Sequence, residues 1–190
     1  PHGTQIIDVK DPKKPKLLAE LTMPPGTHSH KVRVHGDLML VNREALAVHS
    51  LQGEVPPEGY NGGLGIYDIS KPAQPKLITE WKATLGPGAS YARGVHRFDF
   101  DGRYAYISPT VDGYIGNIVM ILDLKDPAKP QEVGRWWMPG TRAGDNVRPP
   151  PRHPLDKGYR AHNTNVYPQR GDRCYLAYID GGMFVLDISD

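Results

Sequence analysis

Short runs of apolar and β-branched residues alternate with proline and glycine turn signals along the whole chain. One phrase begins at Ile6, Ile66 and Ile121 and starts again at Val185: an apolar run carrying an aspartate, two prolines separated by two residues, and a second apolar run. Proline cannot donate to a sheet ladder, so the double-proline segment must connect two strands. The aspartate is expected to accept hydrogen bonds from the amides of that connection.

A second phrase, led by histidine, lies between the copies of the first. The segment "HKVRVHGDLMLVN" from His30 aligns with "HRFDFDGRYAYIS" from His96, and "HNTNVYPQRGDRCYLAY" from His162 is a looser third copy with a longer turn. The three histidines are evenly spaced along the chain. In the first two copies a glycine marks a tight turn between two strands.

Together the two phrases predict a repeating unit of four short antiparallel strands. The histidine leads the first strand, the turn leads to the second, the aspartate lies in the third, and the fourth follows the prolines. Such repeated units are typical of β-propeller blades. The approximate units are 1–26, 27–85, 86–140 and 159–190, within a single all-β domain or fragment. An ordinary β-sandwich is the alternative.

The predicted strands amount to about three and a half blades, whereas propellers have roughly four to eight. We therefore expect a partial propeller, in which the remaining blades of a larger propeller, or another chain, cover the open edges.

Strand order predicts where the histidines lie. If the histidine-led strand is the innermost of its blade, then all three histidines belong at the same mouth of the central channel. The long insertions 43–63 and 141–160 connect strands at that same end, and the connections at the other end are short. Long loops on one end of a rigid scaffold commonly carry binding and catalysis.

Imidazoles from three blades converging near an axis predict a transition-metal site at His30, His96 and His162. His28 adds a fourth candidate, because strand residues two apart share a face. A structural role, in which each histidine caps a turn, remains the alternative.

Arg93 and Arg160 precede two of these histidines and are the candidate catalytic residues. They are expected to contact an anionic substrate or a carboxylate beside the metal. Surface arginines at loop ends are the alternative interpretation.

Composition narrows the partners. Lys and Arg number 23 against 21 Asp and Glu, and no basic block occurs, so we expect no nucleic-acid partner. No apolar run approaches the roughly 20 residues of a membrane helix. The single Cys174 excludes an intramolecular disulfide and is expected to be a buried, inert thiol. The compartment stays open: the protein is expected to be soluble, and periplasmic or secreted if a signal peptide has been removed.

The phrases "GLGIYDISKPAQPKLI" and "NIVMILDLKDPAKPQEV" resemble those of LVIVD-repeat β-propellers. More distantly, the repeat is similar to the selenium-binding protein and methanethiol oxidase family. Methanethiol oxidases are copper-dependent propellers with channel histidines. The resemblance therefore implies a metal held by His30, His96 and His162, with copper first and iron or zinc as alternatives. The reactive cysteine motif of the selenium-binding branch does not occur.

Two functions follow as expectations. The first is a metal-dependent oxidoreductase that acts on a small-molecule substrate at the channel mouth. The second is a non-catalytic binding propeller whose top face, the end that carries the histidines and the long loops, binds a protein or carbohydrate. Propellers are known to support catalysis as well as binding.

Overall fold

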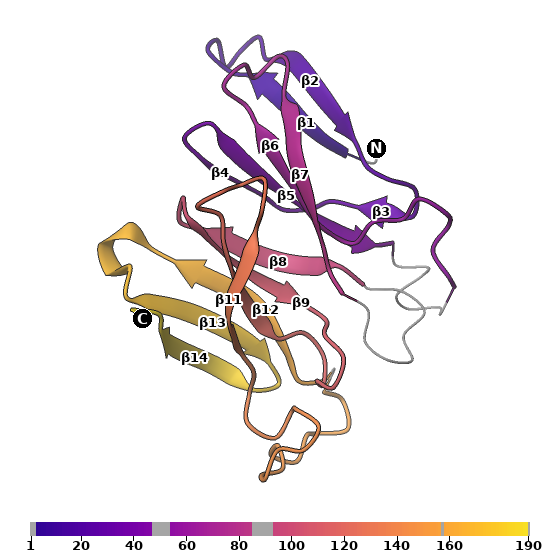
Figure 1. Ribbon diagram of the computed structural model, residues 1–190, viewed down its shortest axis with the longest axis vertical. Helices are drawn as coiled ribbons and strands as arrows, with labels where there is room; N and C mark the ends of the chain where they lie inside the picture. Colours follow the sequence, from indigo (N-terminus) through magenta and orange to yellow (C-terminus); the bar gives the residue numbers. More distant parts are fainter. Residues whose placement is uncertain (1–2, 47–53, 85–92, 157, 190) are drawn as a thin grey trace.

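The computed structural model describes residues 3–46, 54–84, 93–156 and 158–189, and within them the chain is an all-β partial propeller of antiparallel sheets (Figure 1). The first sheet pairs β1 (Gly3–Asp8) with β2 (Lys16–Thr22). The second contains β3 (Thr27–His28), β4 (Val32–His35), β5 (Leu38–Ala45), β6 (Gly63–Asp68) and β7 (Lys76–Lys82).

The third sheet contains β8 (Val95–Phe100), β9 (Tyr104–Pro109), β10 (Val119–Asp123) and β11 (Gln131–Trp136). The fourth contains β12 (Arg160–Val166), β13 (Arg173–Ile179) and β14 (Gly182–Asp187), with a short 3₁₀ turn at Pro168–Arg170 before β13. The strands follow one another in chain order within each sheet, as propeller blades require. The predicted fold class is confirmed. Residues 47–53 and 157 of the two predicted insertions lie outside the described residues.

The four sheets form an arc, with β1–β2 at one end and β12–β14 at the other (Figure 1). The inner strand β8 contacts β4 and β5 of the preceding sheet and β12 of the following one. The histidine-led strands are therefore adjacent, which is the arrangement that brings residues of different blades together.

The aspartate of the repeated phrase closes the turn after its own strand. Asp8 Oδ1 accepts a hydrogen bond from the Lys10 amide at 2.9 Å. The same contact recurs from Ser70 to Asp68 at 2.8 Å, from Lys125 to Asp123 at 2.8 Å and from Ser189 to Asp187 at 3.0 Å. The bond from the Ser70 amide helps to hold the pKa of Asp68 below its ordinary value. The predicted structural role of these aspartates is confirmed.

Apolar side chains fill the spaces between neighbouring sheets. One buried cluster joins the second and third sheets through Leu40, Ile66, Phe98 and Ile107. Another joins the third and fourth through Val119 and Leu176, with Trp136 and Phe184 packed against it. Cys174 is buried in the fourth sheet, and burial raises the pKa of its thiol to about 12. The predicted burial of this thiol is confirmed, and its raised pKa agrees with the expectation that it is inert.

The inner strand of the second sheet is broken at its histidine. The sequence predicts a single strand from His30, whereas the structure has β3 before it and β4 after it, both paired with β5. Asn42 explains the break, because its Oδ1 accepts hydrogen bonds from the amides of His30 at 2.9 Å and Lys31 at 2.8 Å. The Asn42 side chain thus accepts the hydrogen bonds that a backbone carbonyl of β5 would accept in a regular ladder. The inner strand can therefore contain one extra residue at this point.

The next two inner strands carry the same irregularity. In β8 the two residues His96 and Arg97 face Ser108, whose hydroxyl accepts from the Arg97 amide at 3.0 Å and donates to the Arg97 carbonyl at 2.8 Å. In β12 His162 is the extra residue between Ala161 and Asn163. Each is a β-bulge, a local insertion that redirects side chains and is frequent beside functional sites. Every histidine of the repeat therefore lies at a bulge.

Asn42 also joins two blades. Its side chain is fully buried, and its Nδ2 donates to the carbonyl of Val95 in β8 at 2.9 Å. We expect Asn42→Ala to lower the free energy of unfolding by about 2 to 3 kcal/mol, because two amides and one carbonyl lose their partner in a partly buried place. Denaturant titration measures this loss. Asn146→Ala, in the exposed loop after β11, is the control and should stay within about 0.5 kcal/mol of the parent. An equally small loss for Asn42→Ala would contradict the role of this side chain.

Candidate metal centre at the channel mouth

Four imidazoles from three blades lie in a row at one end of the inner strands. The ring centroids of His28 and His30 are 5.0 Å apart, those of His30 and His96 5.3 Å, and those of His96 and His162 5.1 Å. The structure thus places all four predicted metal residues in one row, but among the described residues the group whose ligand atoms lie within 4.8 Å of one another contains His28, His30 and Glu44, without His96 or His162. We refer to His28, His30, His96 and His162 as the imidazole row. Their role as ligands stays a prediction.

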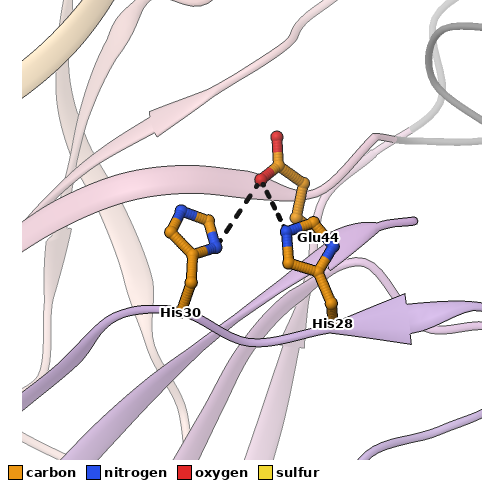
Figure 2. A group of neighbouring side chains, drawn as sticks. All are labelled: His28, His30 and Glu44. Carbon is orange, nitrogen blue, oxygen red and sulfur yellow. Dashed lines mark ion pairs between the residues drawn. The ribbon is translucent and has the colours of Figure 1, made fainter. Parts of the chain in front are cut away.

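One carboxylate approaches three members of the imidazole row. Glu44 lies at the end of β5, and its Oε2 is 3.6 Å from His28 Nε2 and 3.9 Å from His30 Nδ1 (Figure 2). Both oxygens of the carboxylate are 3.0 Å from His96 Nδ1. The Glu44 side chain is only 18% exposed. Within the described ranges, the groups that reach Glu44 at ion-pair distance are imidazoles, and no lysine or arginine does so.

This geometry fits a metal ion. The ligand atoms of His28, His30 and Glu44 all lie within 4.8 Å of one another. Two nitrogen or oxygen ligands that share an ion about 2 Å away lie roughly 3 to 4 Å apart, so only a small contraction is needed. In addition, His28 Nδ1 is buried with no hydrogen-bond partner among the described residues. The donor set of imidazole and carboxylate suits copper, iron and zinc.

Two members of the imidazole row are held in the unprotonated form. Burial lowers the pKa of His30 to about 4, and the nearby His28 and His96 add to this effect although Glu44 opposes it. Burial likewise lowers the pKa of His162, helped by the charges of Arg97 and Arg160. A neutral imidazole offers a lone pair to a metal or a proton. At neutral pH these rings are therefore ready to act as ligands or bases.

Asparagines orient two of the rings. Asn42 Nδ2 lies 3.3 Å from His30 Nδ1. His162 Nδ1 lies 2.5 Å from Asn163 Oδ1, which can only accept, so this nitrogen carries the proton and Nε2 carries the lone pair.

The two predicted arginines occupy different places. The carbonyl of Arg93 accepts hydrogen bonds from the Ala45 amide at 2.9 Å and the Tyr60 hydroxyl at 3.0 Å, so its backbone ties β5 to the third blade. Arg160 begins β12, and its charge contributes to the lowered pKa of His162. Arg160 therefore lies near the imidazole row, and the substrate contacts of both arginines stay predictions.

Sequence reasoning missed Glu44 and Arg97. A signal for Glu44 exists, because a carboxylate stands in the strand "LMLVNREA", whose other members are mostly buried. Arg97 directly follows His96, and only the bulge in β8 reveals that it stays close to the site.

Fold and site together define a partial propeller whose adjacent inner strands carry the imidazole row. A family model, the LVIVD repeat, matches residues 59–82 and 170–190. These segments include β6 with β7 and β13 with β14, so LVIVD repeats are present as the sequence predicts. A comparison with curated proteins finds no match. Within the described residues, no helix is long and apolar enough to cross a membrane.

The lowered pKa of His30 gives a direct test. We expect its imidazole resonances to titrate with a midpoint at about pH 4, measured by NMR and assigned with His30→Gln. The unfolded chain binds this proton near pH 6.5 and the folded protein only near pH 4, so stability falls as the pH drops through that window. His30→Gln should flatten that part of the pH profile of unfolding. A midpoint at or above 6.5 would contradict the burial argument.

Proposed function

We propose that the channel mouth binds a transition-metal ion and that the protein is a metal-dependent oxidoreductase acting on a small molecule. The observation that supports this most is the environment of Glu44. This carboxylate is largely buried, and among the described residues it is approached by imidazoles alone, of which His30 is neutral at pH 7. Burying a carboxylate is costly, the hydrogen bond from His96 offsets part of that cost, and a bound cation would offset the rest.

His28, His30 and Glu44 would hold the ion, with His96 as a further ligand from the next blade. A redox-active metal, when bound, supplies electron exchange with the substrate. Copper is the first candidate, in line with the distant similarity to methanethiol oxidases, and iron is the alternative that can exchange electrons. Zinc would suit the same ligands but has no redox chemistry.

His162 lies at the far end of the imidazole row from His28, and we assign it the role of a base. Its Nδ1 proton is fixed by Asn163, and its lowered pKa keeps Nε2 unprotonated at pH 7. A substrate proton can therefore be accepted at Nε2. The bulges at His96 and His162 fix the rings without a mobile loop, which favours pre-organised chemistry.

One observation favours the second candidate, a binding propeller. A groove of about 430 Å³ lies where β11 runs into the loop after it, lined by Trp136, Trp137, Pro139 and Val147 among others. Exposed aromatic faces bind carbohydrates and peptides. In this alternative the top loops grip a partner, and the imidazole row has only a structural role.

Metal analysis separates the two candidates. We expect the full, untagged chain to retain about one transition-metal ion after dialysis, measured by inductively coupled plasma mass spectrometry. His28→Ala and Glu44→Gln should each weaken metal affinity by about 100-fold or more, because each removes a ligand atom. Oxidase activity toward small reduced substrates should fall with metal content.

His153→Ala is the matched control, because His153 is an exposed loop residue and should not affect metal content. Folded Glu44→Gln protein that keeps its metal with unchanged affinity would overturn the site. A chain that binds no metal under any loading condition would overturn the function and leave the binding propeller.

A further inference from the structure

The residues that follow the three bulged histidines all offer hydrogen-bond donors. Equivalent positions in three adjacent blades hold Lys31, Arg97 and Asn163. Two are cations and the third is an amide. Since the Asn163 oxygen already accepts from His162, its NH₂ group is what it can offer a ligand. The three positions therefore present donors, and none of them carries a negative charge.

Arg97 occupies the middle of this set. Burial lowers the pKa of Lys31 in the preceding blade and of His162 in the following blade, and the Arg97 charge adds to both shifts. The guanidinium therefore lies within electrostatic reach of both neighbours. This agrees with the contacts of β8, which packs against β4 on one side and β12 on the other.

Neither cation is neutralised by the part of the chain that the structure describes. Seven other arginines there have acidic partners; for example, Arg33 pairs with Asp99 at 2.7 Å, and Arg103 with Asp123 at 2.8 Å. Lys31 and Arg97 form no such pair with the described residues, and Arg97 Nε is buried with no hydrogen-bond partner among them. A buried donor without an acceptor is costly, and so are two neighbouring like charges. A bound anion removes both costs.

The charges divide the imidazole row into two ends. Glu44 approaches His28, His30 and His96, and the Lys31 charge also acts on His30, whereas Arg97 and Arg160 act on His162. A cation is favoured at the first end and an anion at the second. The two sites are adjacent, and their opposite charges do not compete for the same ligand.

We propose that Arg97, with Lys31 on one side and Asn163 on the other, binds an oxyanion group, such as a carboxylate, on a small molecule held beside His96 and His162. A guanidinium offers a planar pair of donors that matches a carboxylate, and the ammonium adds a third contact. One cation pair at a channel mouth suits a single compact anion rather than a polyanion, which needs a track of charges. That this anion is the substrate of the metal centre rests on the proposed function.

Direct binding to metal-free protein tests the inference without reference to activity. The full chain, stripped with a chelator, is titrated with sodium acetate and with sodium sulfate at constant ionic strength. We expect saturable shifts of the His162 imidazole resonances in the millimolar range. Arg97→Gln and Lys31→Gln should each weaken binding about tenfold or more. Arg97→Lys should retain part of the affinity, because lysine keeps the positive charge but lacks the planar pair of donors.

Arg148→Gln is the control. Arg148 is exposed in the loop before β12, so this substitution removes the same charge at a place away from the proposed site. Circular dichroism shows whether each variant is folded. If Arg97→Gln is unfolded, the binding of acetate and sulfate to Lys31→Gln is the test. Absence of saturable shifts in the parent chain, or equal loss in Arg148→Gln, overturns the anion site. Metal affinity of the same variants is measured in parallel. Metal retained without anion binding overturns this inference alone, and anion binding without metal overturns only the proposed function.

Discussion

An extra residue in each inner strand is the constraint on which the site depends. A regular strand would alternate its side chains between the two faces of the blade and bury them against neighbouring blades. The bulges at His30, His96 and His162 interrupt that alternation, so that an imidazole and the residue after it stay near the channel. Asn42 and Ser108 stabilise two of these irregularities with side-chain hydrogen bonds. Packing between the blades and the composition of the site are therefore set by the same few residues.

The charges around the imidazole row follow from this geometry. Glu44 comes from the second strand of its blade and reaches toward the first, whereas Arg97 comes from an inner strand itself. Burial keeps His30 and His162 unprotonated, so at neutral pH these two rings do not add positive charge that would repel a cation at Glu44.

The sequence alone was sufficient for the architecture. Prolines, turn glycines and the recurring aspartate mark strand ends by local chemistry, and the even spacing of three histidines then gives their common height in the blades. Glu44 and Arg97 could not be found in the same way. Glu44 has no charged counterpart in the next blade, where Thr110 stands, and Arg97 is near the site only because of a bulge that strand periodicity does not predict. Side-chain replacement of a ladder hydrogen bond, as by Asn42, depends on tertiary packing rather than on local propensity.

The equivalence of positions between blades has a consequence for how such a site can diversify. The residue after the histidine is Lys31 in one blade, Arg97 in the next and Asn163 in the third, and each follows the same kind of bulge. Gene duplication of one blade supplies symmetric ligands, and point substitutions at equivalent positions then break the symmetry without altering the fold. Specificity can therefore evolve, or be engineered, one blade at a time, because side chains at these positions change while the backbone stays the same.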